Sequence, residues 1–131
     1  VTDNKTGLMW KRCSQGLYGV NCELGNILMT SWDLALQQAS KSSFAGYQDW
    51  RVPNIKELQS IVEEQCISPA INRSAFPGDS FTNVWSSSVY KIPAPFEEFS
   101  PRSAWIVLLV NGSSDFRRRS LAMWSVWLVR G

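Results

Sequence analysis

Two segments in the first half of the chain have the apolar spacing of amphipathic helices. The first is predicted over residues 30–41, where Thr30 and Asp33 resemble the two ends of a capping box. Its apolar residues recur at intervals of three and four and would share one face: Trp32, Ala35, Leu36 and Ala39. We expect this face to pack against the core.

The second helix is predicted to begin at Asn54, directly after Pro53, and to end near Glu64. Glu57 occupies its third position, from which a carboxylate can accept a hydrogen bond from the backbone of the capping residue. Four apolar residues keep helical spacing: Ile55, Leu58, Ile61 and Val62. The pattern is typical of a short helix with one buried face.

The second half of the chain has strand patterns, and residues 8–12 suit a short strand as well. Residues 84–90 alternate, whereas residues 104–110 are apolar without alternation and indicate a central strand covered on both faces. Asn111-Gly112 is a strong hairpin signal, so the next strand should return antiparallel. A last strand over 123–130 would place Trp124, Val126 and Leu128 on one face and Ser125, Trp127 and Val129 on the other. Two helices followed by antiparallel strands indicate an α+β fold.

The length and composition narrow the class of protein. The 131 residues fit one domain, 1–131, and 44% hydrophobic with 18% charged residues is too apolar for disorder and too interrupted for a membrane span. The chain has no histidine, which removes Ser-His-Asp and Cys-His nucleophiles, His-liganded zinc and the usual neutral-pH general base. We therefore expect neither an enzyme nor membrane insertion.

Positive charge is concentrated late in the chain. The formal net charge is +2, but residues 100–131 hold five arginines against the single acid Asp115, so this part is +4 and the first 99 residues are −2. The arginines are Arg102, Arg117, Arg118, Arg119 and Arg130. This asymmetry favours an anionic partner, with no nucleic acid expected. The alternative is that folding scatters the arginines over different faces.

Three cysteines are present, and none belongs to a CxxC motif. Cys13 and Cys22 flank a short loop with two glycines, so a local disulfide is sterically easy. Cys66 is left over and would be buried, paired between chains, or in competition for one of the other two. Such a disulfide favours an exported protein, and the start at Val1 without a signal peptide indicates a mature fragment or an excised domain.

Several strings occur together, in order, along nearly the whole chain. They are Thr2-Asp3-Asn4-Lys5-Thr6-Gly7-Leu8-Met9-Trp10, Asp49-Trp50-Arg51-Val52-Pro53-Asn54-Ile55-Lys56-Glu57-Leu58, Pro69-Ala70-Ile71-Asn72, Trp85-Ser86-Ser87-Ser88, Ala104-Trp105 and Val129-Arg130-Gly131. In these strings the chain resembles the bacterial family named after the C-terminal domain of Lcl, a collagen-like adhesin of Legionella.

This resemblance implies a C-type-lectin-like fold in which the N- and C-terminal strands pair and a long loop region sits on a second small sheet. It also implies a surface adhesin that binds sulfated glycosaminoglycans as a trimer on a collagen-like stalk. The layout is similar to that of formylglycine-generating enzymes, but their activity needs reactive cysteines near the C-terminal end, and the last cysteine here is Cys66. The commonest family ending has an arginine where this chain has Trp127.

The run Arg117-Arg118-Arg119 is the best candidate site, because guanidinium groups carry planar paired donors that match sulfate and stay charged at any relevant pH. On a strand, Arg117 and Arg119 would share one face with Arg118 opposite. Lys91 and Arg102 would join the patch from the loop before the central strand. The alternative is a solvated edge whose charges deter aggregation.

The small number of charges in such a site predicts that several copies of the domain bind together. Exposed charge pairs contribute only about 0.2 to 1 kcal/mol each, so three to five of them give a site of roughly millimolar affinity. Linked copies raise the avidity by about 10² to 10⁴ without a new contact. A sulfated polysaccharide that meets a homotrimer would satisfy this, and salt should weaken the binding.

Other residue groups receive structural interpretations. Four tryptophans are expected in the core: Trp10, Trp32, Trp50 and Trp105. Two positions remain possible for Trp85, Trp124 and Trp127, namely the core and a subunit interface. Asp49 with Arg51 is interpreted as an ion pair or turn, and residues 86–88 as strand-surface serines, since no base lies near them to activate a nucleophile.

A calcium site is disfavoured, because it needs roughly six to eight converging oxygens and the candidate acids are dispersed along the sequence. The candidates are Glu63, Glu64, Asp79, Glu97, Glu98 and Asp115. We expect no cofactor and a secreted or cell-surface location. Two other functions are kept: a protein-binding or trimer-assembly module with an aromatic surface, and a neutral-sugar lectin that stacks sugars on tryptophan.

Overall fold

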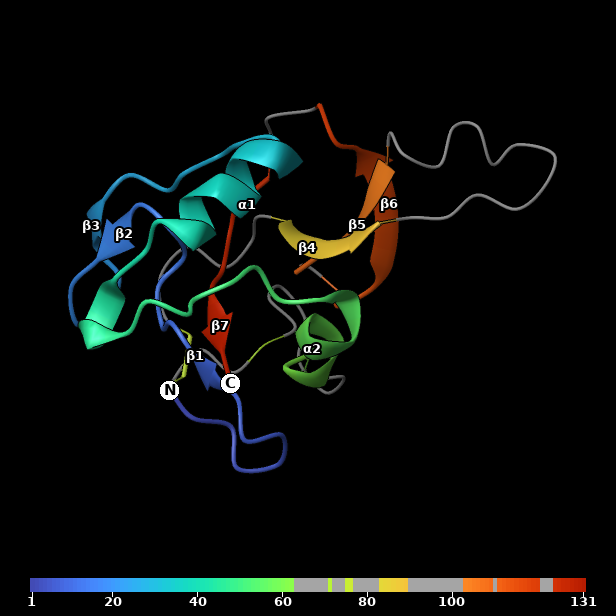
Figure 1. Ribbon diagram of the computed structural model, residues 1–131. Coiled ribbons are helices and arrows are strands. Elements are labelled where there is room, and N and C mark those ends of the chain that lie inside the picture. Colours follow the sequence, from blue (N-terminus) through green and yellow to red (C-terminus); the bar gives the residue numbers. More distant parts are fainter. Residues whose placement is uncertain (63–70, 72–74, 77–82, 90–102, 110, 121–123) are drawn as a thin grey trace, which may run out of the picture.

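The computed structural model describes residues 1–62, 71, 75–76, 83–89, 103–109, 111–120 and 124–131. Two helices and several short antiparallel strands make up this part of the chain (Figure 1), which confirms the α+β prediction. The elements are β1 (Met9–Trp10), β2 (Leu17–Tyr18), β3 (Leu24–Gly25), α1 (Trp32–Ser40), a short 3-10 helix η1 (Phe44–Gly46), α2 (Ile55–Ser60), β4 (Val84–Val89), β5 (Ser103–Val107), β6 (Ser114–Arg118) and β7 (Val129–Arg130).

The strands β4, β5 and β6 form an antiparallel sheet with β5 in the centre, as the apolar run predicted. Four of the five β5 residues are buried, because the strand is covered on both faces. The hairpin after it turns at Gly112, whose φ of 77° suits glycine and whose backbone N–H donates to the Leu108 carbonyl oxygen over 2.7 Å. The predicted antiparallel return strand is thereby confirmed.

The two ends of the chain lie side by side (Figure 1), because β1 and β7 pair antiparallel with Met9 opposite Arg130 and Trp10 opposite Val129. The segment before β7 differs from its prediction as a strand over 123–130, since only Val129–Arg130 is a strand and residues 121–123 lie outside the described part.

The alternation predicted for this last segment is nevertheless present, because alternate residues pack into two different core clusters. Trp124, Val126 and Leu128 pack in the cluster that contains Trp32 of α1, whereas Trp127 and Val129 pack in a second cluster with Leu58 of α2. All six residues from Trp124 to Val129 are buried. The segment therefore runs between two halves of the core, with neither face in solvent.

The helix α1 begins one residue later than its predicted cap. Ser31, without a side-chain hydrogen bond, is the N-cap, and the backbone N–H of Thr30 instead donates to the Trp124 carbonyl oxygen. The capping-box prediction for Thr30 and Asp33 was wrong, because this backbone bridge fixes Thr30 outside the helix. The face predicted to be buried is correct for Trp32, Ala35 and Ala39, and Leu36 is partly buried.

The helix α2 has the capping box that its sequence predicted. The Asn54 side chain accepts the Glu57 backbone N–H over 2.8 Å, and the Glu57 carboxylate accepts the Asn54 backbone N–H over 2.9 Å. The helix ends at Ser60, earlier than the predicted Glu64, which lies outside the described residues.

Tryptophan fills much of the core. The buried rings are Trp10, Trp32, Trp50, Trp85, Trp124 and Trp127, and Trp105 is half-buried. Core positions are thus confirmed for three of the four tryptophans that were assigned there, and Trp105 is only partly covered. Trp85, Trp124 and Trp127, for which burial was one of two alternatives, are buried, each with at most 8% of its surface exposed within one copy of the chain.

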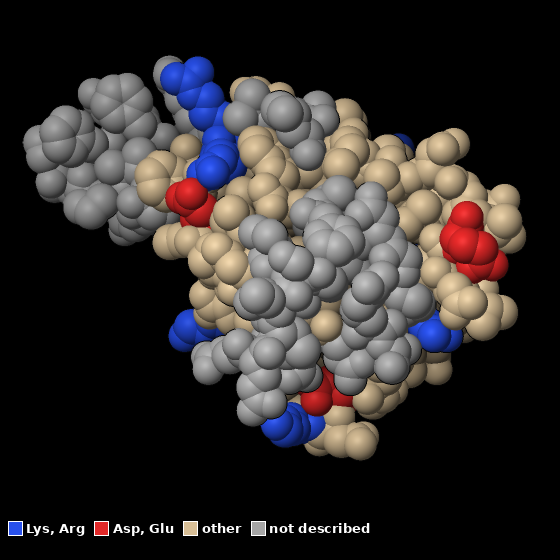
Figure 2. All heavy atoms as spheres, turned by 180° about the vertical axis from the view of Figure 1, so that it is seen from behind, with Lys and Arg blue, Asp and Glu red and all other residues tan. Residues whose placement is uncertain are grey.

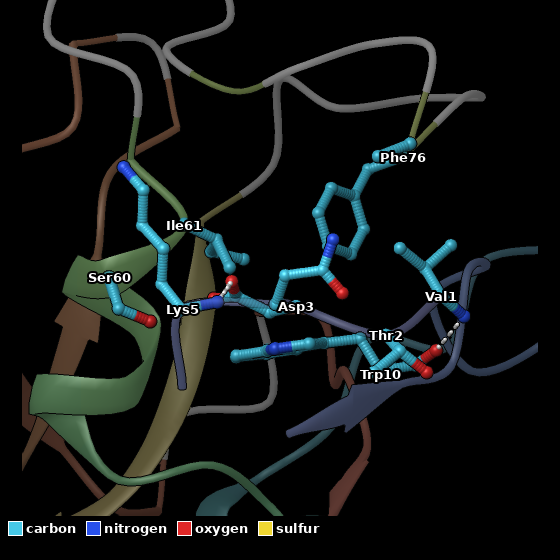
Figure 3. A pocket seen from close by; sticks show the side chains of 10 residues that line it. Val1, Thr2, Asp3, Lys5, Trp10, Ser60, Ile61 and Phe76 are labelled. Carbon is cyan, nitrogen blue, oxygen red and sulfur yellow. Dashed lines mark hydrogen bonds between the residues drawn. The ribbon is translucent and has the colours of Figure 1, made fainter. Parts of the chain in front are cut away.

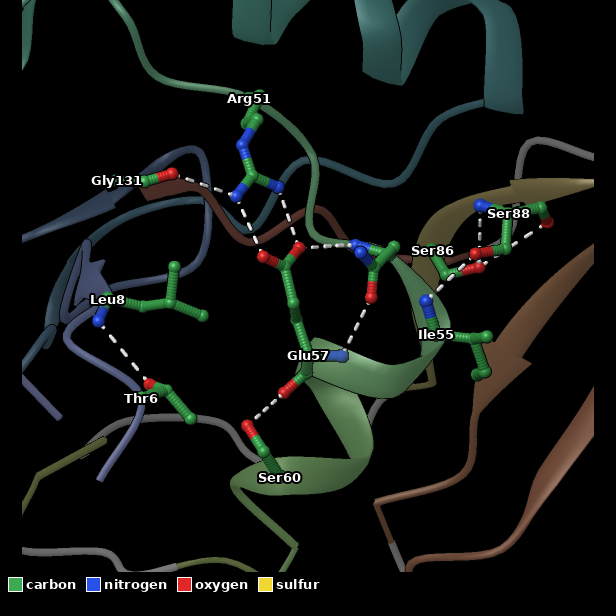
Figure 4. Close-up of polar contacts among 10 residues, drawn as sticks. Thr6, Leu8, Arg51, Ile55, Glu57, Ser60, Ser86, Ser88 and Gly131 are labelled. Atoms are coloured by element: carbon green, nitrogen blue, oxygen red, sulfur yellow. Dashed lines mark hydrogen bonds and ion pairs between the residues drawn. The ribbon is translucent and has the colours of Figure 1, made fainter.

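The serines of β4 are structural, but the prediction that they lie at the strand surface is wrong for Ser86, which is fully buried. The Ser86 hydroxyl donates to the Trp105 carbonyl oxygen over 2.8 Å. Ser88 Oγ accepts the Ile55 backbone N–H over 2.9 Å, which fixes the start of α2 against β4 (Figure 4).

Candidate functional site

The three consecutive arginines lie at the end of the small sheet. Arg117 and Arg118 are the last two residues of β6, and Arg119 lies in the turn that follows. Arg118 is exposed, whereas Arg117 and Arg119 are half-buried. Because the strand ends at Arg118, strand alternation no longer governs where Arg119 points.

Arg117 is paired with an acid of its own strand. Its Nη1 lies 2.6 Å from Oδ2 of Asp115, two residues earlier and therefore on the same strand face. The hydrogen bond from Arg117, together with the Phe116 backbone N–H, holds the pKa of Asp115 below its usual value. Much of the Arg117 charge is thus compensated. Sequence reasoning missed this pair, although the spacing of two on a strand signals it.

Arg119 packs on the first residue of α1. Its guanidinium carbon lies 4.7 Å from the centroid of the Trp32 ring, and its carbonyl oxygen accepts the Trp32 backbone N–H over 3.0 Å. The Arg119 Nε is buried and has no hydrogen-bond partner in the part of the chain that the structure describes. The two residues are far apart in sequence, and no local pattern indicates this contact.

Arg118 and Arg119 line one open pocket of about 290 Å³ together with Asp33 of α1 and Ser120. Both residues thus border one pocket, although strand alternation predicted them on opposite faces. Neither arginine forms a salt bridge with any carboxylate of the described residues. The pocket is thus bordered by two arginines, one exposed aspartate and one serine.

The arginines of the C-terminal third do not all gather here. Arg130 bonds Asp49 through Nε over 2.7 Å and lies 3.7 Å from the Tyr47 ring centroid, beside β1. Figure 2 accordingly shows one group of basic side chains on the β6 side, with an acidic group next to it, and single basic groups elsewhere. The scattering alternative is correct for Arg130. Lys91 and Arg102 lie outside the described residues.

A second polar cluster holds the chain ends together. The guanidinium of Arg51 donates two parallel hydrogen bonds to the Glu57 carboxylate, over 2.6 and 2.7 Å, and a third of 3.3 Å to the Gly131 carbonyl oxygen (Figure 4). The hydrogen bonds from Arg51 lower the pKa of Glu57, and the carboxylate raises the pKa of Arg51. The predicted pairing of Asp49 with Arg51 is wrong, because each finds another partner once the chain folds.

The disulfide predicted between Cys13 and Cys22 is present, with an S–S distance of 2.04 Å. Next to it lies a pocket of about 260 Å³ with Lys11 at its rim. Its apolar lining residues are Leu17, Tyr18, Val20 and Phe44, of which all but Leu17 are exposed. Cys66 lies outside the described residues.

A third pocket of about 310 Å³ lies between the N-terminal segment and the end of α2 (Figure 3). Trp10 and Phe76 meet there edge to face, with ring centroids 6.1 Å apart. The Trp10 indole N–H is buried and has no hydrogen-bond partner among the described residues. Trp127 stacks on Phe76 with ring centroids 5.1 Å apart and donates to Ser14 Oγ.

Within the described ranges, no three His, Cys, Asp or Glu side chains lie close enough together to hold a metal ion. The same part of the chain contains no helix that is both long and apolar enough to cross a membrane. The disulfide is compatible with an oxidising, extracellular environment.

Comparison with known proteins places this fold and these motifs in one family. No curated protein matches the chain. The family model described as Lcl C-terminal domain matches residues 1–130, which include the paired ends, the Arg51–Glu57 cluster and the arginine pocket. The chain belongs to the Lcl C-terminal domain family.

Proposed function

We propose that this domain is a non-enzymatic adhesin module that binds sulfated glycosaminoglycans, or similar polyanionic polysaccharides, through Arg118 and Arg119. The observation that carries the proposal is the pocket in which these two guanidinium groups lie without a carboxylate partner among the described residues. Membership of the Lcl C-terminal domain family supports it.

The chemistry of the pocket suits a sulfate group. A guanidinium presents its N–H donors in one plane, in pairs that match two oxygens of a sulfate. The Arg119 guanidinium lies 4.7 Å from the centroid of the Trp32 ring, and this contact orders the side chain that would meet an oxyanion. Arg117 contributes less, because Asp115 already occupies its Nη1.

Useful affinity requires several copies. Two or three exposed guanidinium–sulfate pairs at about 0.2 to 1 kcal/mol each give weak binding by a single domain. We therefore propose that the domain acts as a homotrimer, whose linked sites engage successive sulfates of one polymer and gain avidity.

The proposal extends to the fold family and the location. The paired strands β1 and β7 and the separate sheet β4–β5–β6 are compatible with a C-type-lectin-like fold, which the family resemblance implies. The Cys13–Cys22 disulfide supports secretion or display on a bacterial surface, where such bonds persist. Host attachment and biofilm adhesion follow from binding to such polysaccharides.

Elution from a heparin column against salt tests the function. The parent domain should be retained, and the change of Arg117, Arg118 and Arg119 together to alanine should lower the salt needed to elute it, because released counterions drive binding of this kind. The matched control changes three exposed lysines, Lys5, Lys41 and Lys56, to alanine. Both triple variants take the formal net charge from +2 to −1.

If overall charge alone governed retention, the two triple variants would elute together, and the assignment to the arginine pocket would be wrong. If the parent domain passed through the column without retention at low salt, the glycosaminoglycan function itself would be wrong. Circular dichroism of each variant verifies that the fold is intact.

The apolar pocket beside the disulfide favours a second candidate, a protein-binding or assembly module. Tyr18, Val20 and Phe44 are 61%, 75% and 48% exposed next to the basic Lys11. Replacement of Tyr18 and Val20 by serine should then abolish the self-association measured by sedimentation. The monomeric variant should still be retained on the heparin column. A neutral-sugar lectin that stacks sugars on tryptophan is a weaker alternative, because six of the seven tryptophans are buried and Trp105 is half-buried.

A further inference from the structure

The arginine pocket also contains an acid. Asp33 is the second residue of α1, it is exposed, and it lines the pocket with Arg118, Arg119 and Ser120. A site that recognised only negative charge would gain nothing from a carboxylate, since like charges repel. Its presence beside two arginines therefore needs a chemical reason.

Asp33 is not there to neutralise the arginines. It forms no salt bridge with Arg118 or Arg119, although all three line one pocket. Asp115 shows the contrast, because it bonds Arg117 at 2.6 Å on the neighbouring strand. The Asp33 oxygens thus remain available as hydrogen-bond acceptors for a ligand.

The position of Asp33 relative to the arginines is fixed by the fold. The Trp32 backbone N–H bonds the Arg119 carbonyl oxygen at 3.0 Å, and the Arg119 guanidinium lies over the Trp32 ring. These two contacts join the first turn of α1 to the turn after β6. Asp33, the residue after Trp32, and the two arginines therefore border the same pocket.

We propose that Asp33 is a specificity-determining residue, which makes this pocket select a sulfated sugar unit over a bare polyanion. The inference rests on the function proposed above and specifies its ligand. Arg118 and Arg119 bind the sulfate, and Asp33 accepts a hydrogen bond from a hydroxyl or sulfamido N–H next to that sulfate. A polymer without such a donor meets the same carboxylate as a repulsive charge.

The test compares two soluble probes, a heparin tetrasaccharide and linear inorganic polyphosphate, of which only the first carries hydroxyl and N–H donors. The main variant is Asp33→Asn, which removes the charge and leaves the side chain nearly the same size. Its control is Glu23→Gln, which removes another exposed carboxylate, directly after Cys22, and keeps an oxygen for the Asn21 backbone N–H. Dissociation constants come from amide chemical-shift titrations at fixed salt.

Asp33→Asn should tighten polyphosphate binding about threefold, the effect of removing one exposed like charge a few ångströms from the ligand in water. Heparin binding should stay unchanged or weaken, because a charged acceptor is lost along with the repulsion. The preference for heparin should therefore fall at least about threefold. Glu23→Gln should leave this preference as in the parent.

If Asp33→Asn raised the affinity for both probes by the same factor, or left both affinities unchanged, Asp33 would not determine specificity and this inference would be overturned. The function proposed above would then still stand, since the parent binds heparin. If the parent domain bound neither probe, the proposed function would fail first, so the two failures are distinguishable.

Discussion

Arg119 lies over the ring of Trp32, 4.7 Å from its centroid, and this contact joins the turn after β6 to the start of α1. The backbone hydrogen bond between the same two residues reinforces it. A long, flexible arginine side chain is thereby ordered before any ligand arrives. Less conformational entropy is then lost on binding than for an unrestrained surface arginine.

Replacement of Arg119 by lysine tests this arrangement. The charge is kept, but the planar guanidinium and its stacking on Trp32 are lost, so the free energy of unfolding should fall by about 0.5 to 1 kcal/mol and heparin should elute at lower salt. The comparison is Arg118→Lys, at an exposed residue. Equal stability of the two variants in urea denaturation would contradict a specific role for the ring contact.

Local features of the fold could be predicted from the sequence because the interacting groups are close neighbours. The capping box of Asn54 and Glu57 spans three residues, and the hairpin after β5 depends on Asn111-Gly112. The disulfide closes a loop with a sequence separation of 9. In each case a few residues determine the geometry.

Contacts between distant segments could not be predicted in this way. Arg51 pairs with Glu57 instead of Asp49, because packing of the chain ends brings Arg130 to Asp49 and Gly131 to Arg51. For the candidate site the sequence predicted that arginines take part, but not that Arg117 pairs with an acid while Arg118 and Arg119 line the pocket. It depends on where β6 ends and on α1, which supplies Asp33 to the pocket.

The Arg51–Glu57 pair makes stability depend on pH. Hydrogen bonds from Arg51 lower the pKa of Glu57 in the folded protein below the value of about 4.5 expected when it is unfolded. The stabilisation is fully present above that value and is lost as the pH falls through the folded pKa. Between about pH 5 and pH 3 the parent should lose stability more steeply than Glu57→Gln in urea denaturation.

The double variant separates this pair from other carboxylates. In an Arg51→Gln background the change Glu57→Gln should alter the slope of stability against pH much less, because Arg51 is the main cause of the lowered pKa and the Asn54 backbone N–H a smaller one. A slope that flattens equally in both backgrounds would show that Arg51 is not the cause.

The Cys13–Cys22 bond should contribute about 2 to 3 kcal/mol by limiting the unfolded chain, since it closes a short ring with a sequence separation of 9. Replacement of both cysteines by serine should lower the free energy of unfolding by that amount. Urea denaturation of the parent and of this double-serine variant measures the difference, and equal stability of the two would contradict a stabilising role for the bond.

Trp127 should not tolerate replacement by arginine. The side chain is 2% exposed and stacks on Phe76, so Trp127→Arg would bury a charge and should cost more than about 3 kcal/mol in thermal or urea unfolding. Trp127→Phe keeps an apolar ring, loses the bond to Ser14 and should cost about 1 to 2 kcal/mol. An arginine variant as stable as the phenylalanine variant would contradict burial as the reason.

The pairing of β1 with β7 determines where a tether could be attached to the domain. Both chain ends emerge next to each other and well away from β6 in the view of Figure 1. A tether attached at either end would therefore leave the arginine side free to meet a long polymer. Copies fixed in a row by one end would all offer that side in the same direction, so a single polysaccharide strand could cross from one to the next.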